Sequence, residues 1–346
     1  MKTSPSARCP PSHVPVDTFI QTVLRASRFR WNFDPSKRSC EKIIREPLLE
    51  ARTLKSDALL LLTAAIWGFA FVAQRVGMDH LGPFTFNGIR FALGCLSLLP
   101  LLAFSRKHVA VAERLVPRPR TSKTLLGGAL AGFALYMGAS LQQAGLVYTT
   151  AGKAGFITGL YVVIVPLLGL FWKQRPDAGT WTGALLAAAG LYFLSVTEEL
   201  TIALGDFLNL LGAFFWAIHV LLIGWLSPKI DSIKLAFIQF AFCSLLSLST
   251  AVFVEAFSWQ DIRQTAIPLL YGGVCSVGVA YTLQVVAQQH APPAHAAILL
   301  SLESAFAALG GWLLLQETLG GRGLFGCALM LAGMLLSQLR IFGRSS

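Results

Sequence analysis

From Ser56 onward, the sequence consists largely of apolar runs that follow one another with only short polar joins. A bilayer core about 30 Å thick is crossed by roughly 20 apolar residues in helical conformation. The runs are rich in Leu, Ala, Gly and Phe and lack the alternation of barrel strands, the other structure that can span a membrane. A water-soluble domain of this length is excluded by 55% hydrophobic residues, 13% charged residues and a mean hydropathy of +0.63. The sequence therefore predicts an all-α integral membrane protein.

Ten transmembrane helices are predicted, joined mostly by short segments containing Gly, Pro or polar residues. The first five spans are Asp57–Met78, Pro83–Phe104, Thr124–Gly145, Ala151–Trp172 and Ala178–Val196. The second five are Leu204–Leu226, Ser232–Ala256, Thr265–Gln288, Pro293–Leu315 and Gly323–Leu339.

Positive charge lies mainly in segments that face the cytoplasm if the amino terminus does. Eleven Lys and Arg lie in residues 1–55, and six lie between Ser105 and Lys123. Cytoplasmic loops carry this excess in membrane proteins, so we expect a multi-pass protein of the plasma (inner) membrane with both termini cytoplasmic. The same rule explains the pI of about 9.7, so nucleic acid is not an expected partner.

The segment 1–55 is expected to be a cytoplasmic, largely disordered basic tail. It has no apolar core of the kind that a signal peptide needs. Within it, Thr18–Trp31 is basic and could form an amphipathic helix on the inner leaflet.

The two halves of the predicted membrane region resemble each other. In order along the chain, the matches are Asp57 with Asp206, Trp67 with Trp216 and Phe91 with Phe240 under a shift of 149 residues, then Gln142 with Gln284 and Gly169 with Gly311 under a shift of 142. Because each half has an odd number of spans, the second copy must enter the membrane from the opposite side. We therefore expect two inverted five-helix repeats, over 56–196 and 204–340, as many secondary transporters have. A duplication that only enlarged a scaffold is the alternative.

Several stretches resemble a known transporter family. The similarity is to the EamA-type branch of the drug/metabolite transporter superfamily, and it is carried by "AAIWGFAFVAQRVG", "FNGIRFALG", "LQQAGLVYTTAGKAGFITGLYVVIVPLLGLFWKQRP" and "LLSLESAFAALGGWLLLQETL". It extends over about Ser56 to Leu339. The resemblance implies ten helices, cytoplasmic termini and a central cavity formed by the first four helices of each repeat. It also implies transport of amino acids, other metabolites or drugs.

Four large or polar side chains lie about ten residues into their spans, near the middle of the membrane at a rise of 1.5 Å per residue. They are Trp67, Tyr161, Trp216 and Glu303. A mainly apolar pocket with few polar groups suits a small molecule, so we predict that these side chains bind a small organic solute. Ordinary helix packing is the alternative for the two tryptophans.

Glu303 is the most informative member of this set. A carboxyl group in the middle of a span is costly unless it is paired, hydrated or protonated, so Glu303 is a candidate to carry a proton or to bind an amine. A protonated acid hydrogen-bonded to a neighbouring helix is the alternative. His219, one helical turn beyond Trp216, could titrate with Glu303, hydrogen-bond the solute or serve only in packing.

Other polar residues in the predicted spans are expected near the ends of helices or at contacts between them. Gln142 and Gln284, towards the ends of the third and eighth spans, are expected to line the mouths of the cavity or to join helices. Arg90, about seven residues from an outer end, is expected to snorkel to the interface. Lys153 is expected at the interface, and Pro166 is a candidate hinge within the fourth span.

The remaining sequence gives no sign of a cofactor or a catalytic centre. It contains no Walker loop and no His, Asp and Glu cluster with metal-ligand spacing, so we expect neither ATP drive nor a metal. We therefore predict a secondary transporter, a monomer or homodimer in the lipid bilayer, that is not an enzyme. A membrane-embedded enzyme and a non-transporting scaffold or receptor are the alternative classes.

Overall fold

The computed structural model describes residues 35–103, 121–172, 178–195, 203–318 and 320–339. These described residues contain helices and turns but no strand. The chain divides into two units, Met1–Glu50 and Ala51–Ser346. In the first unit residues 35–50 are described, and they are helical. The amphipathic helix predicted for Thr18–Trp31 lies outside the described residues.

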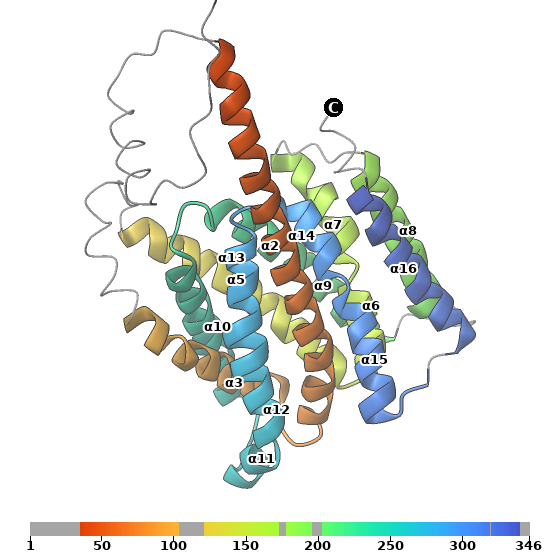
Figure 1. Ribbon diagram of the computed structural model, residues 1–346. Helices are drawn as coiled ribbons and strands as arrows, with labels where there is room; N and C mark the ends of the chain where they lie inside the picture. The colour runs from red at the N-terminus through yellow and green to blue at the C-terminus, as the bar shows by residue number, and fades with distance from the viewer. Residues whose placement is uncertain (1–34, 104–120, 173–177, 196–202, 319, 340–346) are drawn as a thin grey trace, which may run out of the picture. The chain divides into compact units, whose positions relative to one another are not determined.

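The membrane region is built from helices throughout its described length (Figure 1). In chain order they are α2 (Pro35–Gly77), α3 (Pro83–Ser97), α5 (Thr121–Leu146), α6 (Ala151–Thr158), α7 (Tyr161–Gly169), the 3₁₀ helix η1 (Leu170–Trp172), α8 (Ala178–Ser195), α9 (Leu204–Leu226), α10 (Ser232–Val254), α11 (Trp259–Gln264), α12 (Ala266–Leu270), the π-helix η2 (Tyr271–Tyr281), α13 (Thr282–Ala287), α14 (Pro293–Leu300), α15 (Glu303–Leu315) and α16 (Gly321–Leu339).

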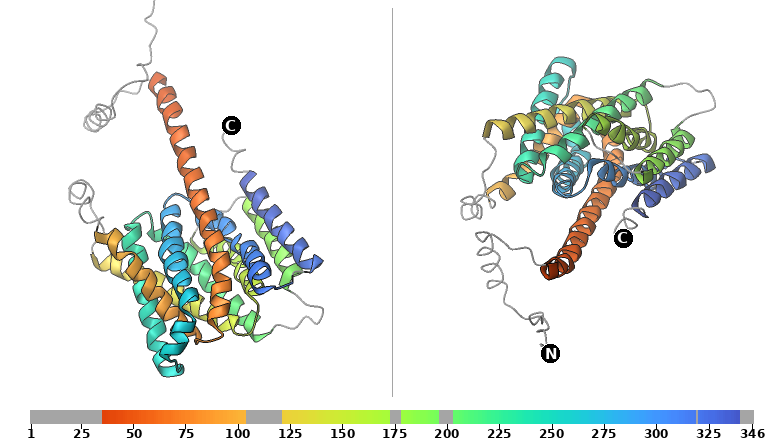
Figure 2. Two further views of the ribbon diagram at one scale, coloured as in Figure 1. Left: turned by 60° about the horizontal axis from the view of Figure 1, so that its bottom comes forward. Right: turned by 90° about the horizontal axis from the view of Figure 1, so that it is seen from above.

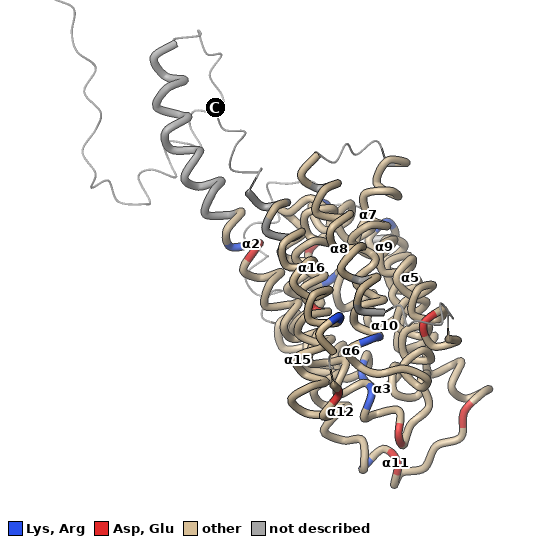
Figure 3. The backbone as a smooth tube through the Cα atoms, turned by 90° about the vertical axis from the view of Figure 1, so that its right-hand side faces the viewer, with Lys and Arg blue, Asp and Glu red and all other residues tan. Residues whose placement is uncertain are grey.

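Eight helical stretches among the described residues are long and apolar enough to cross a membrane. They are Thr53–Gly77, Pro83–Ala103, Ser122–Leu146, Ala151–Gly169, Leu204–Leu226, Ser232–Val254, Ala266–Ala287 and Pro293–Leu315. Each overlaps one of the first four spans predicted for its half. The predicted fifth and tenth spans are helical as α8 and α16, but their apolar stretches, Trp181–Gly190 and Gly321–Gly333, are shorter. Figure 3 shows how few charged residues these helices carry.

Helices from corresponding places in the two halves pack against each other. α3 packs against α10, α6 against α15 and α8 against α16, and the last pair is seen side by side in Figures 1 and 2. The rings of Phe91 and Phe240, which match in the internal repeat, have centroids 6.3 Å apart. Both belong to one buried apolar cluster that draws on both halves. The halves therefore share a core.

Two of the spans are interrupted near their middles, at equivalent places. α6 gives way to α7 at Gly159–Leu160, and α14 gives way to α15 at Ser301–Leu302. At each interruption the backbone forms a tighter turn, because the amide of Leu160 donates to Ile157 O (3.1 Å) and that of Leu302 to Leu299 O (3.2 Å). A shift of 142 residues relates the two turns.

The sequence predicted one continuous fourth span with a hinge at Pro166. The structure instead has the interruption at Gly159–Leu160, and Pro166 lies inside α7. Pro166 has no amide hydrogen to donate to the preceding turn, but the helix continues through it. Glycine at position 159 permits the close approach of α15 at this break, because a side chain there would meet Ser304 Oγ.

The predicted eighth span, Thr265–Gln288, contains a π-helix where the sequence predicted an ordinary α-helix. The wide turns of η2 lie against α2, to which two hydrogen bonds tie it. Trp67 Nε1 donates to Ser276 O (3.2 Å), and Tyr271 Oη donates to Ile66 O (3.0 Å). π-helical turns are rare and are often found at functional sites. Here the π-helix places two of its residues, Ser276 and Tyr281, beside an internal cavity.

Candidate functional site

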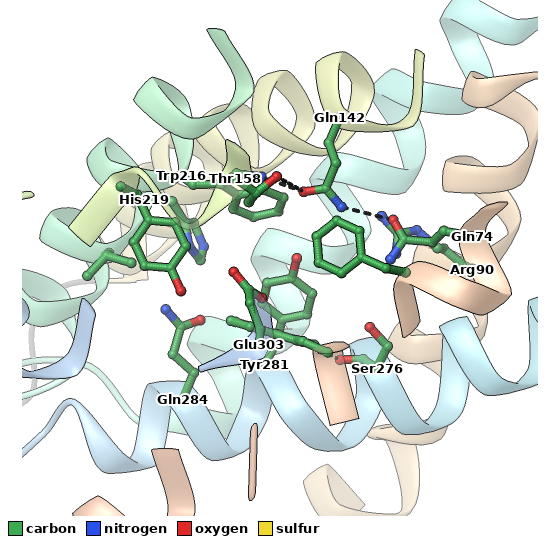
Figure 4. Close-up of a pocket in the computed structure, with 14 residues that line it drawn as sticks. Gln74, Arg90, Gln142, Thr158, Trp216, His219, Ser276, Tyr281, Gln284 and Glu303 are labelled. Carbon is green, nitrogen blue, oxygen red and sulfur yellow. Dashed lines mark hydrogen bonds between the residues drawn. The ribbon is translucent and has the colours of Figure 1, made fainter. Parts of the chain in front are cut away.

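A small cavity lies among the spans of both halves, and Figure 4 shows its lining. It is lined by Trp67, Phe71, Gln74, Arg90, Gln142, Thr158, Tyr161, Trp216, His219, Val220, Ser276, Tyr281, Gln284 and Glu303. All of these side chains are buried except Trp67, which is half-buried. The cavity has a volume of about 30 Å³, which leaves room for about one or two water molecules.

The structure brings all of the predicted site residues to this one cavity. They are Trp67, Gln142, Tyr161, Trp216, His219, Gln284 and Glu303. Two of them, Tyr161 and Glu303, are the first residues after the two helix interruptions. The interruptions therefore place a phenol and a carboxyl group, at equivalent positions of the two halves, beside the same space.

Gln142 joins three helices to its own helix α5. Its Oε1 accepts hydrogen bonds from Trp216 Nε1 on α9 (2.9 Å) and from Thr158 Oγ1 on α6 (3.5 Å), and its Nε2 donates to Gln74 Oε1 on α2 (3.0 Å). Of these three partners, two come from the first half and one from the second. Of the two predicted alternatives, Gln142 therefore joins helices, and it also lines the cavity itself.

Gln284, which matches Gln142 in the repeat, is in a different situation. It is fully buried, and neither its Oε1 nor its Nε2 has a hydrogen-bond partner among the described residues. Buried polar groups are normally hydrogen-bonded to protein or water. The amide of Gln284 is therefore free to bind water or a solute in the cavity.

Tyr281 is the centre of an aromatic cluster that the sequence reading missed. Its ring centroid lies 4.4 Å from that of Trp67 and 6.1 Å from that of Trp216, and the Trp216 ring is stacked at 25°. The rings of Phe91 and Phe240 each lie 6.0 Å away. Tyr281 is one helical turn before Gln284, so the prediction of Gln284 could have led to it.

His219 is fully buried next to the aromatic cluster. Its ring centroid lies 6.0 Å from that of Trp216 and 6.1 Å from that of Tyr281, edge-on to both. Its Nε2 is 2.8 Å from Gln239 Oε1, whereas Nδ1 has no partner among the described residues. The His219 ring therefore packs against the aromatic cluster, and its Nδ1 remains available for a hydrogen bond to water or a solute.

Glu303 lies at the start of α15 with its side chain buried. Its carboxyl group is within interaction range of the Tyr161 hydroxyl. No ion pair to Glu303 is recorded among the residues that the structure describes. The carboxyl group of Glu303 therefore has a phenol beside it but no recorded ion-pair partner among the described residues.

Arg90 does not reach the interface, so the prediction that it snorkels is wrong. Its side chain is 1% exposed and lines the cavity. Its Nε donates to Asn87 Oδ1 (2.8 Å), and its guanidinium carbon lies 4.9 Å from the ring centroid of Phe91 and 5.8 Å from that of Phe86. Distance from a helix end does not reveal which face a residue occupies, and Arg90 lies on the face that packs inside.

Two contacts to aspartate side chains occupy equivalent positions in the two halves. Lys153 Nζ forms an ion pair with Asp206 Oδ2, joining the start of α6 to the start of α9. His295 Nε2 lies 2.7 Å from Asp57 Oδ1, joining the start of α14 to α2. Asp57 and Asp206 are related by the shift of 149 residues, and Lys153 and His295 by the shift of 142. The interfacial Lys153 of the prediction is therefore tied to a second helix.

Comparisons with known proteins give a consistent result. The model of the EamA-like transporter family matches residues 54–196 and again residues 203–339. The chain is 34% identical to an uncharacterized transporter of Archaeoglobus fulgidus over 84% of its own length and 88% of the relative. It is 25% identical to a probable amino-acid metabolite efflux pump of Escherichia coli K12, over 84% and 95% of the two chains.

A solved crystal structure has a similar fold. The two chains superpose with a TM-score of 0.63 at 17% sequence identity, and the match includes 84% of this chain and 98% of the other. At that identity the likeness bears on the fold alone.

Proposed function

Because the chain belongs to the EamA-like transporter family, we propose that it is a secondary transporter that moves a small organic solute across the membrane by alternating access. The family model matches both halves, so the transporter domain is duplicated. We propose the boundaries 56–196 and 204–340 for the two repeats. The solute is proposed to bind in the central cavity, at Trp67, Gln142, Tyr161, Trp216, His219, Gln284 and Glu303.

In the proposed topology the two repeats have opposite orientations in the membrane. In this topology the eight long apolar helices are joined by α8 and α16 as the fifth span of each half. Because each half then has an odd number of spans, the second half enters the membrane from the opposite side to the first. The excess of Lys and Arg in 1–55 and in Ser105–Lys123 favours cytoplasmic termini in the plasma (inner) membrane.

The observation that carries the proposal is the pair of equivalent contacts at Asp57 and Asp206. In the proposed topology, Asp57 and His295 lie at the cytoplasmic end of the cavity, and Lys153 and Asp206 lie at the outer end. A transporter that opens alternately to either side needs one closure at each end, and an inverted repeat supplies both from a single ancestral contact. A scaffold built by duplication has no need of closures around a buried polar cavity.

The size of the cavity supports a conformational cycle. Pockets that hold small organic ligands have volumes of about 300–1,000 Å³, whereas this one has about 30 Å³. A solute can therefore occupy it only when the surrounding helices separate. The interruptions at Gly159–Leu160 and Ser301–Leu302 lie beside the cavity and are suitable hinges, because their backbones already depart from the regular helix.

Glu303 and its neighbours give the proposed site its chemistry. A buried carboxyl group can exchange a proton with the solvent when the cavity opens, which would couple solute movement to protons. It can also bind an amine directly. Gln284 offers an unpaired amide, and the rings of Trp67, Trp216 and Tyr281 offer apolar surface to the body of the solute.

The transport function is tested by solute partitioning. Cells that lack the protein are compared with cells that overproduce it, and metabolites inside and outside are quantified. Transport predicts that at least one small organic solute changes its partition in opposite directions in the two strains. That solute is then followed in liposomes containing the purified protein. No change in the partition of any solute, with the protein present in the membrane, would contradict the proposal and favour a scaffold or receptor.

A further inference from the structure

Arg90 carries a buried positive charge without a matching negative group. Its side chain is 1% exposed, and its Nη2 has no hydrogen-bond partner among the described residues. The one hydrogen bond recorded for its guanidinium is from Nε to Asn87 Oδ1, which is neutral. No ion pair to Arg90 is recorded in the described part of the chain.

A guanidinium group stays protonated in proteins, so Arg90 cannot remove the cost of its burial by losing a proton. The ring faces of Phe86 and Phe91 offset a part of that cost. A buried ion is fully compensated only by an opposite charge with good hydrogen-bond geometry. Arg90 is thus a buried cation whose charge is compensated by no recorded ion pair among the described residues.

We infer that Arg90 binds a carboxylate group of the transported solute, so that the substrate class is small organic carboxylates. The inference rests on the proposed function, because it assigns the solute's acid group to that same cavity. The planar fork of a guanidinium fits a carboxylate with two parallel hydrogen bonds. Nη2, the unpartnered nitrogen, supplies one of the donors.

The rest of the cavity fits the other parts of such a solute. Tyr281 is within electrostatic range of both Arg90 and Glu303, so the cation and the carboxyl group both lie near the aromatic cluster. Figure 4 shows Arg90 across the labelled group from Gln284. A carboxylate at Arg90 therefore directs the remainder of the solute along the rings towards Gln284 and Glu303.

The obvious rival partner for Arg90 is the carboxylate of Glu303 in another conformation. A free inorganic anion is a second rival. Comparing each acid with its own amide distinguishes these rivals from a solute carboxylate. The amide keeps the size and the apolar body of the acid but lacks the negative charge of the carboxylate. The probes are 3-phenylpropionate and 4-methylpentanoate with their amides, leucine with leucinamide, phenethylamine, and inorganic phosphate.

The experiment measures thermal stabilisation of the purified full-length protein by each probe, and counterflow of the radiolabelled acids in liposomes. Carboxylate probes are expected to raise the melting temperature of the native protein, and the amides, phenethylamine and phosphate are not. In Arg90→Gln, loss of a charge-assisted bidentate bond should weaken carboxylate binding by about tenfold to a hundredfold. Arg90→Lys keeps the positive charge but cannot form two parallel hydrogen bonds, so it should bind the carboxylate probes with intermediate affinity.

Stability without ligand separates binding from a structural role. Removing an uncompensated buried charge is neutral or stabilising, so ligand-free Arg90→Gln should melt at or above the native temperature. The matched control is Arg75→Gln, because Arg75 is partly exposed and paired with Asp79 in the turn that follows its helix. Its carboxylate binding should equal that of the native protein.

Four results would overturn the inference. These are equal responses to acids and amides, stabilisation by phosphate alone, native affinity in Arg90→Gln, or destabilised ligand-free protein in both Arg90 variants. Absence of any response to the carboxylates would overturn it as well. The proposed transport function can fail independently of the inference. Carboxylate binding without counterflow would support the Arg90 binding site and contradict the transport function. Flux of uncharged solutes would support transport and contradict the role of Arg90.

Discussion

Lys153 and Asp206 form an ion pair between the starts of α6 and α9, and their repeat equivalents, His295 and Asp57, also contact each other. The side chains of Lys153 and Asp206 are 28% and 11% exposed, so the pair is only partly screened by solvent. One duplicated contact thus occurs at two places around a shared cavity. This arrangement is what a mechanism with two alternating closures requires.

A charge exchange tests whether the Lys153–Asp206 pair acts as a closure. Lys153→Asp and Asp206→Lys each place like charges together, so each should favour an open outer end and slow solute exchange in liposomes. The double exchange restores attraction and should recover a coupling of about 1 kcal/mol in a double-mutant cycle. The same exchange at Arg75 and Asp79, a local pair at the end of α2, should leave the rate unchanged. Additive effects of the two Lys153–Asp206 changes would show that the contact plays no part in the cycle.

The two repeat-equivalent glutamines should behave differently when made apolar. Gln142→Leu removes the acceptor of the buried Trp216 indole and the donor to Gln74, which should cost about 1–3 kcal/mol of stability. Gln284→Leu breaks no recorded hydrogen bond, since neither polar atom has a partner among the described residues. Its thermal stability should be native, while solute binding weakens. Equal losses of melting temperature in the two variants would contradict these assignments.

Close packing beside Glu303 is predicted to tolerate no added methyl group at Gly68. A β-carbon there would overlap Phe306 Cβ and the backbone of Glu303 and Ala307, so α15 would have to shift. Gly68→Ala should destabilise the protein by about 1–3 kcal/mol. Gly321→Ala is the control, because a β-carbon at this position in α16 meets nothing within 4 Å. A native melting temperature for Gly68→Ala would show that α15 adjusts freely.

Replacing Glu303 by glutamine separates its two candidate roles. If the carboxyl group carries a coupling proton, Glu303→Gln should abolish accumulation against a gradient but leave exchange between preloaded pools partly intact. Exchange needs no net change in the protonation of the carrier, whereas uphill movement does. If Glu303 binds an amine, the same change should reduce both fluxes and weaken binding at every pH. Native fluxes with an unchanged pH profile would reduce Glu303 to a packing residue.

The spans and most of the cavity could be predicted from the sequence for a physical reason. Membrane-spanning helices need long apolar stretches, so their positions are encoded in composition, as the eight helices that are long and apolar enough to cross a membrane illustrate. The internal repeat then indicated how deep in the membrane a residue lies. Trp67 and Trp216, like Tyr161 and Glu303, were predicted at the same depth, and all four line one cavity. A polar residue at mid-depth is expensive against lipid, and that cost identifies inward-facing positions.

What the sequence did not predict depends on which way a helix faces and on local backbone geometry. Arg90 was assigned to the interface from its depth alone, but it lies on an inward face of α3. Tyr281 was missed because the turns of η2 are wider than those of an α-helix, and hydrophobic periodicity does not distinguish the two over one span. The interruptions before Tyr161 and Glu303 depend on how α6 and α15 cross, which is a tertiary contact.

Alternating access is tested most directly by the reactivity of a single cysteine in the cavity. Ser276 is 1% exposed and lines the cavity, so Ser276→Cys is introduced after replacement of the six native cysteines. A membrane-impermeant thiol reagent is then applied from either side of the membrane in oriented vesicles. The measurement needs no knowledge of the solute.

Alternating access predicts reaction from both sides, with reciprocal changes when one closure is weakened. Asp206→Asn, at the outer pair, should raise the rate of modification from outside and lower it from inside, and Asp57→Asn should do the opposite. Modification from one side only in all three proteins, or an increase from both sides together, would contradict the account.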